Sequence, residues 1–380
     1  MKYSDIIISQ FTLDTKLHYN IIQNISIIII LIYSDKDKTG AEVNSLERII
    51  TALERKVPDR VPHFELLISS KIINEIIPGG DLYDLTEKLE LDGICVKPGF
   101  KKEKIGEDTY LDEKGQILKK TTQDLMDTVN RVIKDEKDLK KFEFPDPNAP
   151  HRWVEINKAI KRFKGKTAII SFIRDGWSEA RDLHGFAETL MDLVDNPKLI
   201  MGIIEKAVEY YVEIGRISAK LGAEVVVTGD DLAGKNGMLM SPYHYKELLF
   251  PALKRLYKKL HSYGLFIIKH SDGNIYPIID LLIEAGVDCL NPIDPTAGMS
   301  LAKVKKDYGK DICIMGNVNC AGSLVFGTEK DVEEEVRNCL KDGAEGGGYI
   351  LSSSNSIPSD VKAKNYIAMV NAVKKYGVYK

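Results

Sequence analysis

The stretch that decides the fold is Leu265-Phe266-Ile267-Ile268-Lys269-His270-Ser271-Asp272-Gly273-Asn274. Its first half is an apolar run without alternation, which is typical of a parallel strand buried on both faces. Its second half is a polar turn that contains glycine. In an extended segment residues i and i+2 point to the same side, so His270 and Asp272 would face one edge of a sheet together.

Seven other short apolar runs repeat this pattern, and amphipathic segments of helical length separate them. Eight strands that alternate with helices predict an α/β protein with a (β/α)8 TIM barrel over residues 45–380. A doubly wound sheet is the alternative, but no G-x-G-x-x-G follows the first strand. The eight predicted strands are Val61–Leu66, Gly93–Val96, Thr167–Phe172, Glu224–Thr228, Leu265–Lys269, Asp288–Asn291, Ile312–Met315 and Gly348–Ser352.

One segment breaks the alternation between the second and third predicted strands. Residues 109–118 read as two short strands around a turn near Lys114-Gly115. This pattern predicts a β-hairpin inserted into the barrel.

The composition excludes several classes of protein. The 380 residues carry a net charge of −3, with 44% hydrophobic and 29% charged residues, as in ordinary soluble globular proteins. A sequence pI of about 6.2 gives no electrostatic footprint for nucleic acid. The five cysteines are odd in number and form no C-x-x-C pair, so we expect no disulfide framework and a cytoplasmic location.

Residues 1–44 form an atypical N-terminal extension. The apolar run Ile27–Tyr33 is shorter than the roughly 20 residues that a membrane span needs, and no small-residue cleavage site follows it. Three interpretations remain open: an appended element of the fold, an anchor at a membrane surface, or a start placed too early. The last is favoured because Asn44-Ser45-Leu46-Glu47 resembles a capping box, which would begin the barrel's first helix.

Polar residues follow at least seven of the predicted strands at the same register, where TIM barrels place their active sites. His270 and Asp272 could bind zinc, act as an acid–base pair or only order their loop. Of the adjacent Asp230 and Asp231, only one should point inward, since neighbouring residues on a strand face opposite sides, and we expect it to be Asp231. Glu65 ends the first predicted strand among apolar residues, where an unpaired carboxylate would cost free energy, so a functional role is expected for it. Asp294 could equally cap a turn. We expect catalytic roles for His270, Asp231, Asp272 and Glu65, and substrate contacts for Asp230, Arg174, Trp177, Asp294, Asn317 and Asn355.

Several of these stretches together resemble the uroporphyrinogen decarboxylase superfamily, especially its corrinoid-linked methyltransferase branch. The resemblance covers about residues 45–380 and implies a TIM barrel. The matching stretches are Val57-Pro-Asp-Arg-Val-Pro, Gly229-Asp-Asp-Leu-Ala, Ser241-Pro-Tyr-His-Tyr-Lys, His270-Ser-Asp-Gly-Asn, Gly316-Asn-Val-Asn and Gly346-Gly-Gly-Tyr-Ile-Leu-Ser.

Two departures from the family pattern bear on the reaction. Uroporphyrinogen decarboxylases carry an arginine-rich loop after the first strand, whereas residues 65–70 contain no arginine, and their catalytic aspartate would fall near Lys97. The methyltransferase branch binds zinc through a His-x-Cys pair and a later cysteine. This chain keeps His270 but has Asp272 and Asn355 at the two cysteine positions.

The resemblance therefore implies a methyltransferase that moves a methyl group from a small donor to a corrinoid protein, with zinc held by His270 and Asp272. Methoxylated compounds fit a site of oxygen and nitrogen ligands. The chain has no Asp-x-His-x-x-Gly signature, so the corrinoid would belong to the partner. A decarboxylase or other lyase acting on a small carboxylic acid or a tetrapyrrole-like substrate, and a non-catalytic ligand-binding barrel, are the alternatives. Dimerisation is common in the family.

Overall fold

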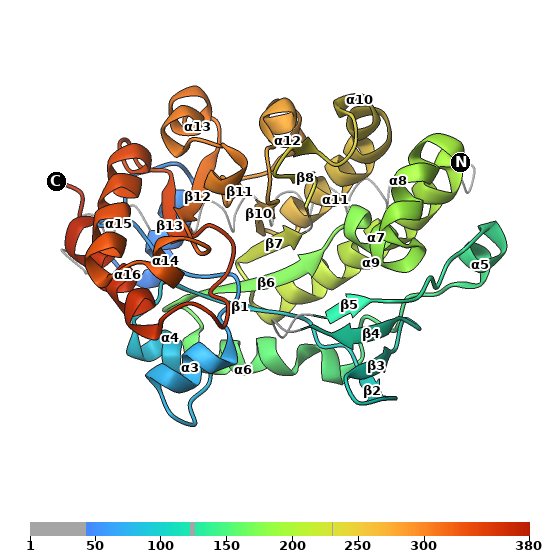
Figure 1. Ribbon diagram of the computed structural model, residues 1–380, viewed down its shortest axis with the longest axis horizontal. Helices are drawn as coiled ribbons and strands as arrows, with labels where there is room; N and C mark the ends of the chain where they lie inside the picture. Colours follow the sequence, from blue (N-terminus) through green and yellow to red (C-terminus); the bar gives the residue numbers. More distant parts are fainter. Residues whose placement is uncertain (1–42, 122–125, 230) are drawn as a thin grey trace, which may run out of the picture. The chain divides into compact units, whose positions relative to one another are not determined.

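The computed structural model describes residues 43–121, 126–229 and 231–380, and the interpretations of the first 42 residues lie outside this part. The centre of the unit Asn44–Lys380 is a seven-stranded parallel sheet (Figure 1). Its strands, in spatial order, are β1 (Gly93–Val96), β6 (Ala168–Arg174), β7 (Val225–Gly229), β10 (Phe266–His270), β11 (Cys289–Asn291), β12 (Cys313–Val318) and β13 (Tyr349–Ser353).

The first predicted strand, residues 61–66, is the one that does not form a regular strand, and it lies between the two edges of this sheet. His63 makes a parallel bridge to Leu351 of β13, and its carbonyl accepts a hydrogen bond from the backbone of Asp92, just before β1. Pro62 has no N–H to donate to a ladder, which limits regular pairing here. The segment therefore connects β13 to β1, and the arrangement is consistent with a TIM-like barrel.

Helices connect and surround the strands, as Figure 1 shows. The long α9 (Pro197–Leu221) begins with proline, which suits a first helical turn. Apart from α2 (Ser45–Leu53), the others are α3 (Ser70–Ile76), α4 (Leu82–Lys88), α5 (Glu136–Lys141), α6 (Val154–Phe163), α7 (Gly176–His184), α8 (Phe186–Asp195), α10 (Pro242–His244), α11 (Phe250–Ser262), α12 (Ile279–Ala285), α13 (Leu301–Tyr308), α14 (Ser323–Phe326), α15 (Glu329–Gly343) and α16 (Ala363–Tyr376).

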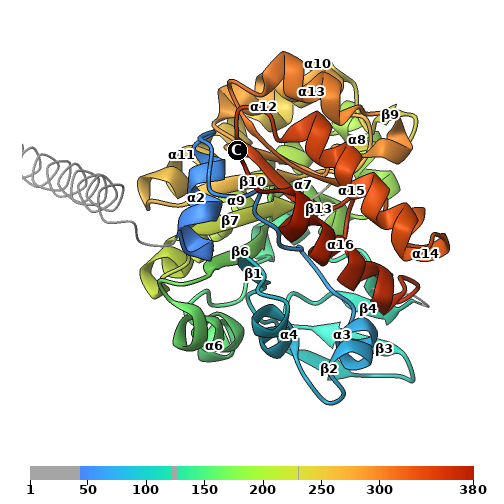
Figure 2. The ribbon, with the colours of Figure 1, turned by 90° about the vertical axis from the view of Figure 1, so that its left-hand side faces the viewer.

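Helix α2 (Ser45–Leu53) covers the N-terminal end of the strands. It opens with the predicted capping box between Asn44 and Glu47, and Leu46 donates to the carbonyl of Lys166, just before β6. Figure 2 shows α2 on the left, with α14 and β9 (Gly237–Met238) on the right beyond the C-terminal strand ends. The mouth of the barrel therefore lies opposite α2.

Alternation along the strands separates two apolar cores. The inner core fills the barrel lumen and includes Phe64, Ile170, Val227 and Ile268, together with residues of α2. The outer core packs the other face of the same strands against the helices. This division decides which polar side chains can reach the mouth, because a residue's parity along its strand selects the lumen or the outer layer.

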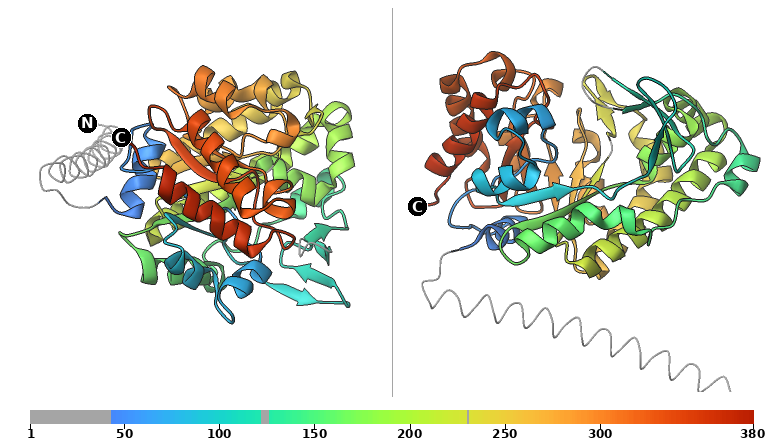
Figure 3. Two further views of the ribbon diagram at one scale, coloured as in Figure 1. Left: turned by 60° about the vertical axis from the view of Figure 1, so that its left-hand side comes forward. Right: turned by 90° about the horizontal axis from the view of Figure 1, so that it is seen from below.

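The predicted single hairpin corresponds to a four-stranded antiparallel sheet between β1 and β6. Its strands follow one another in the order of the sequence, and the turn at Gly115 (φ 81°) joins the middle two. Figures 1 and 3 show this sheet apart from the parallel one. The strands are β2 (Lys102–Lys104), β3 (Thr109–Asp112), β4 (Ile117–Lys120) and β5 (Met126–Thr128).

The described part of the chain contains no helix that is both long and apolar enough to cross a membrane. All five cysteines are free. Cys95, Cys289 and Cys313 are buried, as expected for small hydrophobic residues inside strands.

Candidate functional site

Three of the predicted residues come together at the mouth of the barrel. His270 ends β10, and its Nε2 lies 3.7 Å from Asp231 Oδ1 and 3.7 Å from Asp272 Oδ1. One ligand atom from each residue lies within 4.8 Å of the other two. The carboxylates are about one-third exposed, with side-chain exposures of 33% and 28%, whereas the imidazole is 11% exposed. The group therefore opens toward solvent on its carboxylate side.

The second nitrogen of His270 is fixed by a residue that the sequence did not single out. Nδ1 lies 2.7 Å from Asn291 Oδ1, which can only accept, so Nδ1 carries the proton and the lone pair of a neutral ring is on Nε2. Asn291 in turn donates to Ser352 Oγ at 3.4 Å. The sequence signal that could have indicated Asn291 is its place at the end of a predicted strand. In the sheet, His270 and Asn291 are register partners at the ends of neighbouring parallel strands.

The loop after β10 is held against the loop after β7, which brings Asp272 to Asp231. The Asp272 backbone N–H donates to Asp231 Oδ1 at 2.8 Å, and Ser271 Oγ accepts from the Leu232 backbone N–H at 2.9 Å. Gly273 has φ +86°, and a Cβ there would lie 2.5 Å from the Ala233 backbone. Only glycine fits this close approach.

Two other predicted residues, Asp294 and Trp177, support these loops. Asp294 accepts from the Gly273 backbone at 3.0 Å and caps a turn through Thr296 at 2.8 Å, so its capping interpretation is confirmed. Trp177 is fully buried and donates from Nε1 to the Asp231 carbonyl at 2.9 Å. The Trp177 ring therefore packs beneath the loop and positions Asp231 instead of lining the mouth.

The remaining predicted substrate contacts fall in different surroundings. Asn355 donates from Nδ2 to Asp272 Oδ2, at the edge of the three-residue group. Asn317 is buried and donates to the Ile293 carbonyl at 2.8 Å. Arg174 forms ion pairs with two acidic residues of α7. Asn355 thus bonds directly to a side chain of the group, and Asp230 lies outside the described residues.

Glu65 is not part of the group at the mouth. Phe64 and Leu66 fill the lumen, so Glu65 points the other way, into the outer layer. There its carboxyl group accepts from Ser353 N at 2.9 Å and Ser353 Oγ at 2.6 Å, and Oε1 lies 4.0 Å from His63 Nε2. Burial raises the pKa of Glu65 to about 8 and lowers the pKa of His63 to about 4. Glu65 joins segment 61–66 to β13.

Replacing Glu65 with glutamine is expected to flatten the pH dependence of stability. The folded chain keeps the Glu65 proton up to a pKa of about 8, whereas an unfolded chain loses it near the ordinary value of 4.5. Stability from this group is fully present below the lower value and lost as the pH rises toward the higher one. We therefore expect the free energy of unfolding of Glu65→Gln, measured in urea, to increase relative to that of the wild type as the pH rises from 5 to 8.5. A difference that stays constant over this range would contradict the assignment.

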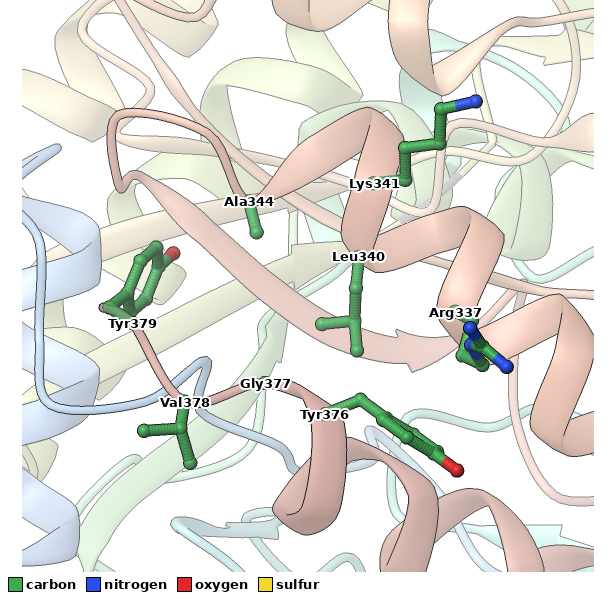
Figure 4. Close-up of a pocket in the computed structure, with 8 residues that line it drawn as sticks. All are labelled: Arg337, Leu340, Lys341, Ala344, Tyr376, Gly377, Val378 and Tyr379. Carbon is green, nitrogen blue, oxygen red and sulfur yellow. The ribbon is translucent and has the colours of Figure 1, made fainter.

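A separate pocket of about 360 Å³ lies between α15 and the C-terminal segment (Figure 4). The residues that line it are Arg337, Leu340, Lys341, Ala344, Tyr376, Gly377, Val378 and Tyr379. None of the predicted site residues is among them, so the group around His270 is the candidate site.

Comparisons with known proteins place the chain among barrel enzymes. A uroporphyrinogen decarboxylase of Mannheimia succiniciproducens is 22% identical over 265 residues, 65% of this chain and 70% of that protein. A methylated-thiol–coenzyme M methyltransferase of Methanosarcina mazei is 23% identical over 220 residues, 58% of this chain and 56% of that protein. A solved methyltransferase structure from Methanosarcina mazei shares the fold with a TM-score of 0.72 and 18% identity, over 88% of this chain and 99% of that one.

The family model for uroporphyrinogen decarboxylase (URO-D) matches residues 121–376, which is well over half of the sequence. This range includes β6 to β13 and every residue of the group around His270. The chain belongs to the uroporphyrinogen decarboxylase family.

Proposed function

We propose that this chain is a methyltransferase that moves a methyl group from a small methoxylated donor to the cobalt of a corrinoid on a partner protein. The observation that carries the proposal is the imidazole of His270, whose Nε2 faces the carboxylates of Asp231 and Asp272 at 3.7 Å each. A methyltransferase among the relatives supports the reaction class.

The same three side chains fit a divalent metal ion. An imidazole nitrogen and two carboxylate oxygens are ligands that Zn²⁺ accepts, and three protein ligands leave a position for substrate. Asn291 would keep Nε2 of His270 available, as outer partners of metal-binding histidines do. When bound there, the ion would supply Lewis acidity that eases departure of the donor's oxygen.

The residues of the chain would position the donor and control its protons. In the transfer, the oxygen–methyl bond breaks and its electron pair stays on oxygen, while Co(I) supplies the pair for the new bond and becomes Co(III). One proton completes the alcohol or phenol product. Positioning and charge stabilisation are what such a displacement needs from a protein, and oxygen and nitrogen ligands suit an ether donor more than a thioether.

The reaction class can be tested with the purified chain, Zn²⁺ and free cob(I)alamin as the methyl acceptor. We expect a panel of methoxylated compounds to yield methylcobalamin, detected by its absorbance. Decarboxylation, which the uroporphyrinogen decarboxylases among the relatives suggest, would instead release CO2 from carboxylic acids without any corrinoid. CO2 release without methyl transfer would overturn the proposal.

Replacing Asn291 with alanine is expected to weaken Zn²⁺ binding about 10- to 100-fold, because His270 would lose the partner that fixes its tautomer. Isothermal titration with Zn²⁺ measures this change. Asn274→Ala is the matched control, since Asn274 lies on the loop after His270 and its side chain bonds to the backbone of Tyr276 and Ala297. Equal affinities for the two variants would show that Asn291 does not position the histidine.

A further inference from the structure

A cation and an aromatic ring lie together at the mouth, on the β1 and β6 side. Lys97 directly follows β1, and its Nζ lies 4.5 Å from the centre of the Phe172 ring. Phe172 belongs to the strand face that packs on the lumen core, and it is only partly buried. The Lys97 side chain is exposed. Both groups are therefore at the solvent end of the lumen.

The Phe172 ring also reaches toward the loop that carries Asp231. A Cβ at Gly229 would lie 3.1 Å from Phe172 Cζ, so the ring lies against the bare backbone of the last residue of β7. Asp231 follows two residues later. Across the mouth, the order is thus a cation, an aromatic ring and then the group of His270, Asp231 and Asp272.

We infer that Lys97 and Phe172 form a subsite for an anionic aromatic substrate, so that the methyl donor is a methoxylated aromatic carboxylate. The inference deepens the proposed function and rests on it for the position of the donor oxygen. Lys97 would donate to the carboxylate, Phe172 would contact the substrate ring, and the oxygen would face His270.

The chemistry of the two side chains supports this class of ligand. A lysine ammonium has three N–H donors, so Lys97 can keep contacts within the chain and still bind a carboxylate. A partly buried phenylalanine offers an apolar face on which a planar ring can stack. A donor oxygen held at the group of His270, Asp231 and Asp272 would direct the far end of the substrate ring, which bears the carboxylate, toward the ammonium of Lys97.

Binding of product-like ligands tests the subsite directly. Isothermal titration compares 4-hydroxybenzoate with neutral 4-hydroxybenzyl alcohol, and we expect the wild type to prefer the carboxylate. Lys97→Met should reduce this preference about 10- to 100-fold, and Lys97→Arg should retain most of it. Phe172→Leu should weaken both ligands by a similar factor of about 2 to 10. Lys235→Met, at an exposed lysine between β8 (Ala233–Gly234) and β9, is the control and should keep the preference.

The outcomes separate this inference from the proposed function, because ligand affinity is measured without methyl transfer. A wild type without preference for the carboxylate, or an unchanged preference in Lys97→Met, would overturn the subsite even if neutral methoxylated compounds are demethylated. A preference that depends on Lys97, in a chain that forms no methylcobalamin from any donor, would support the subsite and contradict the methyltransferase assignment.

Discussion

His270→Ala is expected to lower kcat/KM for methyl transfer roughly 10³-fold and to abolish stoichiometric Zn²⁺ binding. The imidazole is the group that both carboxylates face, at 3.7 Å each, and its orientation is fixed by Asn291. Without the imidazole, the carboxylates of Asp231 and Asp272 would repel one another, and the metal ion would lose its nitrogen ligand. The measurement is methylcobalamin formation together with the zinc content of the purified variant.

His261→Ala is the matched control for this prediction. His261 lies on α11, is 38% exposed and pairs with Asp288 at 2.8 Å, away from the mouth. We expect wild-type activity and zinc content from it. If His270→Ala folds, as circular dichroism would show, and keeps both properties as well, the metal-assisted account is wrong.

Lys269→Met is expected to destabilise the fold by about 3–5 kcal/mol, because it leaves a buried carboxylate without its partner. Lys269 Nζ lies 2.7 Å from Asp175 Oδ2, and both side chains are 0% exposed. Asp175 also caps α7 through the backbone of Trp177. The pair thus connects the strand that ends in His270 to the helix that holds the Asp231 loop. Urea unfolding measures the loss.

Two further variants test the cause of that loss. Adding Asp175→Ser to Lys269→Met removes the buried charge and keeps a side chain that can cap α7, so the double variant should recover part of the stability. Lys254→Met breaks the exposed pair with Glu284 and should cost about 0–1 kcal/mol. If all three variants cost the same, the burial of the ion pair would not be the cause.

The strands were predictable from the sequence because seven of them are apolar runs that the parallel sheet buries on both faces. The predicted Leu265–Lys269 and the observed β10, Phe266–His270, differ by one residue at each end. Residues 61–66 were harder, since a proline and the alternation of polar and apolar residues make this segment a connection between sheet edges. The same alternation turns Glu65 away from the lumen.

The inserted sheet has four strands where the sequence predicted a two-stranded hairpin, because its two outer strands carry no apolar pattern. The residues of β2 are all exposed, and those of β5 are exposed or partly buried, so nothing in their sequence indicates a strand. At the site, His270, Asp231 and Asp272 were predictable from strand ends and parity. Asn291 and Trp177 act through bonds to His270 and to the Asp231 backbone, which depend on register and loop packing that no sequence motif records.

The central claim, that His270, Asp231 and Asp272 form a metal-assisted centre for methyl transfer, is tested most directly by titrating the metal-depleted chain with Zn²⁺. With a methoxylated donor and cob(I)alamin present, the rate of methylcobalamin formation should rise with added Zn²⁺ and level off at one equivalent per chain. An Asp231→Asn/Asp272→Asn variant should show no such rise. Full activity of the metal-depleted wild type, or the same titration curve for the double variant, would contradict the account.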